Sequence, residues 1–190
     1  MSAWRYWLVA ALWVVWEAYW IISARSTKRT RSSEPFISRL PVIAGLALSL
    51  FLLFASPWLG GLLGRDLPPH DDLGYFLGLL LAIGGCGCAF WARHSLGRNW
   101  SGRVAIKEGH ELVTSGPYRW VRHPIYAGAL LTVVGSALAL GKAGGLISVA
   151  IMVAIFVHKI RLEEKVLEDH FGPRYADYRR STDALIPFLL

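Results

Sequence analysis

Long apolar runs separated by short polar segments are the main pattern along this chain. Residues 4–24, 40–63 and 73–91 each provide about the 20 apolar residues that a helix needs to cross roughly 30 Å of hydrocarbon. Two shorter runs, 125–140 and 143–157, are joined by a glycine-rich linker that predicts an antiparallel helical hairpin. The pattern therefore predicts an all-α integral membrane protein with about five transmembrane helices, a C-terminal hairpin and a cytoplasmic tail helix.

Basic residues alternate in number between the segments that separate these runs. Lys and Arg number five in residues 25–39, one in 64–72, six in 93–122, one in the hairpin linker and six in 159–180. By the positive-inside rule, this predicts an external N-terminus and a cytoplasmic C-terminus. The same distribution accounts for the net charge of +7 without a nucleic-acid partner. We expect the inner or plasma membrane of a prokaryote.

Composition supports the membrane class and excludes several kinds of site. With 54% hydrophobic and 17% charged residues, the chain is unlike an average soluble domain. Its first apolar run is too long for a signal-peptide core and lacks a small-residue cleavage site, so we expect it to remain as a helix. Cys86 and Cys88 lie in an apolar run with no second ligand pair nearby, which predicts neither a disulfide framework nor a metal site. Glu17 lies inside the first run, where an ionisable group either makes a structural contact or faces a site.

The sequence divides at residue 93 into N-terminal transmembrane helices, residues 1–92, and a region rich in candidate chemistry, residues 93–190. Gly116 and Pro117 predict a turn, and Pro124 stands where the fourth apolar run begins. Arg122 and His123 therefore flank a predicted helix start, whose exposed backbone donors could bind a carboxylate.

Lys159 and Glu163 are four residues apart where the last run continues into a charged segment, so they share one helix face. They could form an exposed ion pair. Alternatively, this face turns inward over the mouth of the hairpin, where Glu163 accepts hydrogen bonds from a ligand and Lys159 holds an anion.

Several motifs in residues 93–190 together resemble the isoprenylcysteine carboxyl methyltransferase family, which is related to phospholipid methyltransferases. The motifs are Gly116-Pro117-Tyr118, Arg122-His123-Pro124-Ile125-Tyr126-Ala127-Gly128, Glu163-Glu164, Phe171-Gly172-Pro173-Arg174-Tyr175-Ala176-Asp177-Tyr178 and Ile186-Pro187. The resemblance implies a transferase that acts at the cytoplasmic membrane face with S-adenosyl-L-methionine as cofactor. Its most favoured reaction is O-methylation of the carboxylate of an isoprenylcysteine-like, lipophilic or prenylated acceptor that enters from the bilayer.

The resemblance also implies which residues form the site. The cofactor would be bound by His110, Glu111, Leu112, Val113, Tyr118, His123, Pro124, Ile125, Tyr126 and Glu163. Lys159 would bind the acceptor carboxylate, and Lys159 and Arg122 are the catalytic candidates. Family members usually have arginine at the position of Lys159, and lysine keeps the charge but loses the bidentate fork.

Other functions remain open at this stage. The acceptor could instead be a thiol, an amine or a phospholipid headgroup, and a thiol or amine would need a base such as Glu163, Glu164 or Tyr126. Membrane sterol reductases look similar over their last helices and bind a nicotinamide cofactor, but this chain is short for that class. A non-catalytic scaffold or transporter subunit is a further alternative, and the oligomeric state is not predicted.

Overall fold

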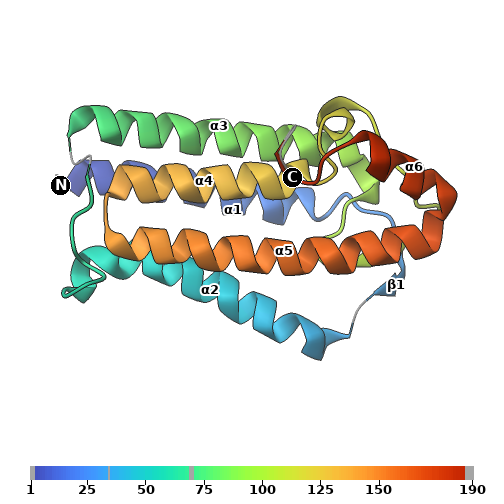
Figure 1. Ribbon diagram of the computed structural model, residues 1–190, viewed down its shortest axis with the longest axis horizontal. Helices are drawn as coiled ribbons and strands as arrows, with labels where there is room; N and C mark the ends of the chain where they lie inside the picture. Colours follow the sequence, from blue (N-terminus) through green and yellow to red (C-terminus); the bar gives the residue numbers. More distant parts are fainter. Residues whose placement is uncertain (1–2, 34, 69–70, 187–190) are drawn as a thin grey trace.

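The computed structural model describes residues 3–33, 35–68 and 71–186 (Figure 1). Its elements in chain order are α1 (Ala3–Ser23), β1 (Thr30–Ser33), α2 (Phe36–Leu59), α3 (Asp72–Leu96), η1 (Gly97–Asn99), β2 (Ala105–Lys107), η2 (Gly116–Arg119), α4 (Pro124–Leu140), α5 (Ala143–Phe171) and α6 (Pro173–Ser181).

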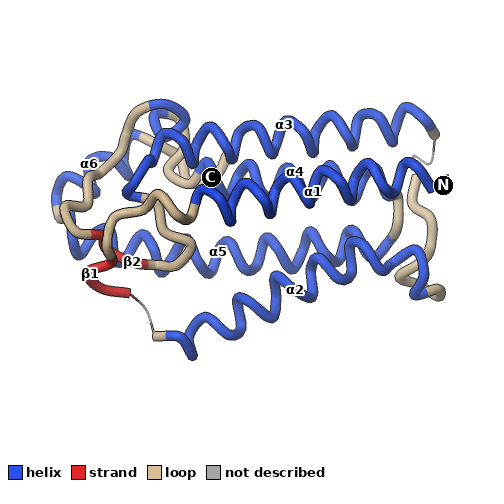
Figure 2. Tube along the Cα trace, turned by 180° about the vertical axis from the view of Figure 1, so that it is seen from behind, coloured by secondary structure: helices blue, strands red, loops and turns tan. Residues whose placement is uncertain are grey.

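The long helices run side by side along the length of the molecule, and α2 diverges from them towards its N-terminal end (Figures 1 and 2). Helix α4 packs against α3 and α5, α1 packs on α4, and α2 packs mainly on α5. This arrangement confirms the predicted all-α membrane fold. Four helices, α1, α2, α3 and α5, are long and apolar enough to cross a membrane, against about five predicted. Helix α4 has 17 residues and a length of about 26 Å, which is shorter than a full hydrocarbon crossing.

Local sequence signals explain where several helices begin and end. The Asp71 side chain accepts a hydrogen bond from the Gly74 N–H and caps α3, which continues to Leu96, so the division expected at residues 92–93 falls inside this helix. Gly141 adopts a left-handed conformation (φ 60°) and ends α4. Since α5 begins at Ala143, Gly141 and Lys142 form the hairpin turn, which agrees with the bounds of the two predicted runs.

The contact between α3 and α4 depends on small residues. A Cβ atom added to Gly85 on α3 would lie 2.6 Å from the carbonyl oxygen of Gly128 on α4, and one added to Gly128 would lie 2.6 Å from that of Gly85. A Cβ atom on Gly84 or Gly87 would meet no heavy atom within 4 Å. Only some glycines of α3 therefore serve helix packing, the general role of small residues between membrane helices.

Buried polar side chains link the helices in pairs. The indole Nε1 of Trp13 on α1 donates to Ser136 Oγ on α4 at 3.0 Å. The hydroxyls of Ser49 on α2 and Ser148 on α5 are hydrogen bonded at 2.8 Å. Such bonds satisfy polar groups that would otherwise lie unpaired in an apolar interior.

A two-stranded antiparallel ribbon, which the sequence did not predict, joins the first two basic segments. β1 pairs with β2 in a register that sets Thr30 opposite Lys107. Beside the ribbon, the Nζ of Lys28 donates to Asn99 Oδ1 at 2.9 Å. The basic segments 25–39 and 93–122 therefore meet at the end of the molecule where α5 continues into α6 (Figures 1 and 2).

Candidate functional site

A cavity of about 530 Å³ lies at this end of the helix bundle. Its apolar part is lined by residues from the middle of the helices: Trp13, Trp16, Leu46, Leu50, Val133, Met152 and Phe156. Its polar part is lined by residues near the helix ends and in the loop after α3: Asn99, Arg103, His110, Glu111, Tyr118, Arg122, His123, Tyr126, Lys159, Glu163, Tyr175 and Tyr178. One cavity thus joins a lipophilic compartment to a set of titratable groups.

Most residues predicted for the site meet in this cavity. Of the ten proposed for the cofactor, nine contribute to its lining: His110, Glu111, Leu112, Val113, Tyr118, His123, Ile125, Tyr126 and Glu163. Arg122 and Lys159 also contribute. Pro124 is not among the lining residues and is instead the first residue of α4, where a proline has no hydrogen bond to lose.

A tight turn places Tyr118 in the cavity wall. Gly116 has a φ of 61° and opens the short helix η2, as the Gly-Pro pair predicted. Tyr118 is buried, and its backbone carbonyl accepts a hydrogen bond from the hydroxyl of Tyr178 at 2.6 Å. Burial, and then the charges of Glu163 and Tyr178, raise the pKa of Tyr118 well above its ordinary value, so this phenol stays protonated.

His110 lies in the loop after β2 and is held there as a neutral ring. The backbone N–H of Lys107 donates to His110 Nδ1 at 3.1 Å, which assigns the ring proton to Nε2. Burial lowers the pKa of His110, and the nearby His170 and Lys28 lower it further. The neutral ring can donate one hydrogen bond through Nε2, whereas its acceptor, Nδ1, is already bonded to the Lys107 N–H.

His123, Tyr126 and Glu163 form one continuous wall. His123 precedes α4, and its buried ring stacks on that of Tyr126 with centroids 5.6 Å apart. The Tyr126 hydroxyl donates to Glu163 Oε2 at 2.8 Å, and His123 Nδ1 lies 3.9 Å from the same oxygen. Glu163 keeps 34% of its side chain exposed, so its carboxylate remains available to a ligand.

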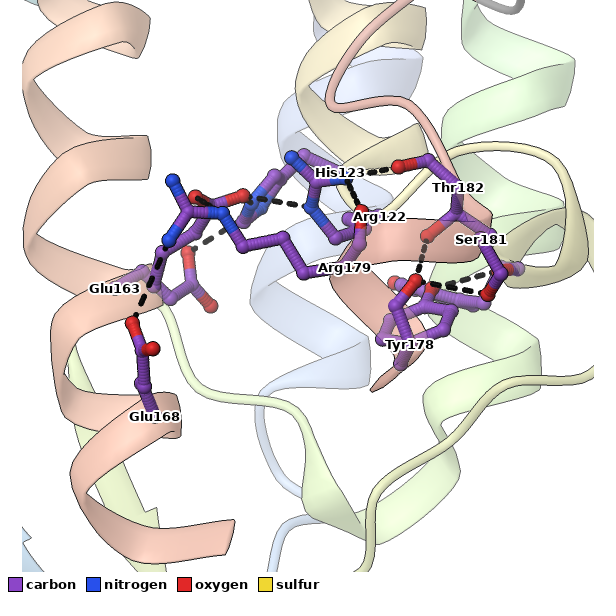
Figure 3. A network of polar contacts seen from close by, with 10 residues as sticks. Arg122, His123, Glu163, Glu168, Tyr178, Arg179, Ser181 and Thr182 are labelled. Carbon is purple, nitrogen blue, oxygen red and sulfur yellow. Dashed lines mark hydrogen bonds and ion pairs between the residues drawn. The ribbon is translucent and has the colours of Figure 1, made fainter. Parts of the chain in front are cut away.

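Behind this wall, Glu164 is enclosed by basic side chains. Figure 3 shows three of them, Arg122, His123 and Arg179, close to Glu163. The Oε1 of Glu164 accepts a hydrogen bond from Arg122 Nε at 2.7 Å and lies 3.3 Å from His123 Nε2, while its Oε2 lies 3.6 Å from Arg179 Nε. Arg122 also donates to the backbone carbonyls of Arg179 and Thr182. This network, which the sequence did not predict, ties α5 and α6 to the start of α4.

Lys159 and Glu163 both face the cavity, as in the second of the two arrangements considered from the sequence. The Lys159 Nζ lies 5.5 Å from the centroid of the Tyr126 ring and 3.5 Å from the carbonyl oxygen of Gly102. Glu17 also lines the cavity, about 9 Å along α1 from the end of that helix. The structure therefore places this carboxylate at the site.

Sequence reasoning assigned no site role to four of the polar residues of the cavity: Asn99, Arg103, Tyr175 and Tyr178. Tyr175 on α6 is 1% exposed, and its hydroxyl has no hydrogen-bond partner in the described parts of the chain. Its place in the motif 171–178 was the only available signal. Asn99, whose Oδ1 accepts from Lys28, gave no signal at all. Pro187, the last motif residue, lies outside the described residues.

Comparison with known proteins gives a consistent assignment. The sequence profile of the isoprenylcysteine carboxyl methyltransferase (ICMT) family matches residues 77–169. Protein-S-isoprenylcysteine O-methyltransferase of Saccharomyces cerevisiae is 35% identical over 116 residues, which cover 60% of this chain and 48% of the yeast protein. An uncharacterised protein of Bacillus subtilis, YpbQ, is 26% identical over 171 residues, 87% of this chain and 98% of YpbQ.

The fold also matches a solved structure. The eukaryotic intramembrane Ras methyltransferase ICMT superposes with a TM-score of 0.56 and 26% sequence identity, over 80% of this chain and 53% of that one. This chain thus spans about half the length of the methyltransferases it matches. The profile, the relatives and the fold all support assigning residues 77–169 to the isoprenylcysteine carboxyl methyltransferase family.

Proposed function

We propose that the protein is an S-adenosyl-L-methionine-dependent methyltransferase that O-methylates the carboxylate of an isoprenylcysteine-like lipophilic acceptor. The observation that carries this proposal is the single cavity in which His123, Tyr126 and Glu163 adjoin an apolar compartment. A polar cofactor and a lipophilic acceptor can meet only where both environments are continuous. The names of the relatives, protein-S-isoprenylcysteine O-methyltransferases, support the same reaction.

The polar groups of the cavity fit this cofactor. S-Adenosyl-L-methionine carries ribose hydroxyls and an ammonium group as donors, and the half-buried Glu163 carboxylate can accept from either. The buried Tyr175 hydroxyl, which has no partner within the described residues, can donate to a polar atom of the ligand. Burial raises the pKa of Tyr175, so this hydroxyl remains a donor at physiological pH.

The reaction needs little acid–base catalysis from these residues. When bound, the cofactor supplies an electrophilic methyl group, and a carboxylate acceptor is already ionised at neutral pH. Positioning is then the main catalytic contribution. Lys159 lines the cavity and would bind the acceptor carboxylate. Arg122 donates through Nε to Glu164 and through Nη1 to two backbone carbonyls, so we assign it a positioning role, orienting His123, in place of a catalytic role.

The lipophilic part of the acceptor would occupy the apolar part of the cavity and enter from the bilayer. The alternating basic segments support a cytoplasmic position for the polar part, where a soluble cofactor is available.

One observation favours a second acceptor class. Glu17 lines the cavity, and its carboxylate would repel an anionic acceptor but attract an amine. An amine-bearing lipid is therefore the alternative acceptor.

The test is methyl transfer by the purified protein in lipid nanodiscs, with the cofactor methyl group isotopically labelled. A farnesylated cysteine analogue with a free carboxylate should become labelled, whereas its carboxamide should not. Calorimetry should show binding of S-adenosylhomocysteine and none of a reduced nicotinamide nucleotide. Binding of the nicotinamide alone would overturn the methyltransferase assignment, and labelling of an amine-bearing lipid alone would replace the carboxylate acceptor.

A further inference from the structure

A second cavity, of about 420 Å³, lies beside the first, and basic side chains dominate its polar lining. Arg39 comes from α2, Arg103 and Lys107 from the loop after α3 and from β2, and Lys159 from α5. No aspartate or glutamate of the described residues lines it. The two cavities share Leu46, Lys159 and the loop segment 100–104.

Among the described residues, the positive charges of Lys107 and Arg103 are poorly balanced by their protein surroundings. Lys107 is only 5% exposed, and its Nζ donates to the hydroxyl of Thr30 at 3.2 Å. Arg103 Nη2 donates to the same Thr30 oxygen at 3.3 Å, so two cations share one neutral acceptor. Burial, and then the charges of Arg103 and Arg93, lower the pKa of Lys107. Because an enclosed ammonium is costly without an anion, a negative ligand would stabilise this arrangement.

The other wall of the smaller cavity is apolar and faces the bilayer. Val42, Ile43 and Leu46 on α2 line it, and Ile43 is 48% exposed on the surface of a membrane helix. Arg39 and Leu46 are about 10 Å apart along the axis of α2. The guanidinium of Arg39 therefore lies at one end of the apolar strip formed by Val42, Ile43 and Leu46. Helix α2 also diverges from α5 at this end (Figure 2). A ligand that fits has an anionic head and a hydrocarbon chain beneath it.

We propose that the smaller cavity binds the phosphate headgroup of an anionic phospholipid taken from the adjoining leaflet. Basic pockets between membrane helices are suited to such headgroups. A free phosphate would leave the apolar strip without a partner, which is why the lipid is favoured. The proposal does not depend on methyl transfer, because Arg39 and Lys107 line only the smaller cavity.

The experiment compares lipid retention by the full chain in nanodiscs that contain phosphatidylglycerol and phosphatidylcholine in equal amounts, read by native mass spectrometry. The parent protein should retain phosphatidylglycerol at least tenfold more than phosphatidylcholine. Lys107→Met and the double variant Arg103→Gln/Lys107→Met should lose this preference. Arg161→Gln should keep it, because Arg161 is exposed on the same helix as Lys159 and lines neither cavity.

Three results would overturn the proposal. The first is an unchanged preference in both cavity variants, provided that their melting temperatures in phosphatidylcholine match the parent. The second is an equal loss of the phosphatidylglycerol preference in Arg161→Gln, which would indicate that anionic lipid is attracted to the basic end of the protein as a whole. The third is displacement of all retained lipid by millimolar inorganic phosphate in a Lys107-dependent manner, which would assign the cavity to a soluble anion.

Discussion

The adjacent residues Glu163 and Glu164 show how strongly single positions differ in this site. Consecutive residues on a helix point about 100° apart, so one carboxylate faces the cavity and the other faces α6. Glu163 is 34% exposed and contacts Tyr126, whereas Glu164 is enclosed by Arg122 and His123. Glu163 can therefore bind a ligand, while Glu164 links α5 to the start of α4 through Arg122 and His123.

Glu163→Gln and His123→Ala should each weaken binding of S-adenosylhomocysteine at least tenfold, or about 1.4 kcal/mol. Glu163→Gln removes the negative charge of a hydrogen-bond-accepting carboxylate from the cavity, and His123→Ala removes the ring that stacks on Tyr126. Isothermal titration calorimetry measures both. Glu168→Gln is the matched control, because Glu168 is exposed on the same helix and should leave affinity unchanged. Parent-like affinity in both test variants would show that these residues do not bind the cofactor.

Lys159→Met should reduce turnover of a carboxylate acceptor at least tenfold, because it removes the cation proposed to bind that group. Cofactor affinity should stay the same or improve slightly, since a positive charge near the sulfonium is lost. Lys159→Arg should retain or raise activity, because its fork suits a carboxylate. Methyl-transfer rates on a farnesylated cysteine analogue check this series. Equal rates in all three proteins would remove Lys159 from the acceptor site.

His110 should make the folded state sensitive to acid. Its pKa is lowered on folding from an unfolded value near 6.5, so its contribution to stability is complete above about pH 6.5 and declines as the pH falls below it. Protonation also costs the hydrogen bond from the Lys107 N–H. Melting temperatures between pH 5 and 8 should therefore fall less steeply for His110→Gln than for the parent. Parallel curves would contradict the assignment of a buried neutral ring.

At the scale of elements, the pairing of α3 with α4 decides where the site can form. Helix α4 begins at Pro124, directly after His123, so its position against α3 also fixes the start of the His123–Tyr126 wall. The backbones approach closely at Gly85 and Gly128, where no side chain intervenes. Small residues in a helix predict close packing, but they do not tell which face packs.

Gly85→Leu should destabilise the protein by about 1–3 kcal/mol or more, because its side chain would meet the α4 backbone. Gly84→Leu, one residue earlier, should have little effect, since its Cβ would meet nothing within 4 Å. Both variants replace one glycine of the same helix by leucine, so the change in helix propensity is the same. Thermal denaturation in detergent compares them, and equal melting temperatures would place the α3–α4 contact on another face.

At the scale of the whole molecule, three basic segments far apart in sequence gather at one end. The segment before α2, the loop after α3 and the region from Lys159 to α6 all contribute to this end (Figure 1). Their shared position agrees with the alternation of basic residues, which predicts that all three lie on the same side of the membrane.

A reporter fused after residue 190 should be active only in the cytoplasm, and one inserted at Asp71 should report the external side. The reason is the distribution of Lys and Arg, which are abundant in the segments at one end of the helices and scarce at the other. Paired enzyme fusions that are active on opposite sides of a membrane provide the measurement. A reversed pattern would separate the site from the cytosolic cofactor pool.

The sequence by itself determined the membrane class, the places of most helices and the resemblance to a known family. Insertion of a helix into hydrocarbon depends on the composition of a continuous run, and the family motifs are local strings of residues. It also indicated the residues His110–Val113, Tyr118, His123, Tyr126 and Glu163 that line one cavity, although it missed the short ribbon and the buried Tyr175 hydroxyl.

Only the tertiary structure decided which side chains share a cavity. Arg39, Lys107 and Lys159 lie on three separate elements, and nothing in their local sequences indicates that they meet. Lys159 and Glu163 share one face of α5, and helical spacing allowed that face to point either to solvent or into the cavity. The structure turns it into the cavity. Spacing fixes neighbours along one helix, whereas the packing of α2, α5 and the loop after α3 sets which helix faces oppose one another, and hence where charge gathers.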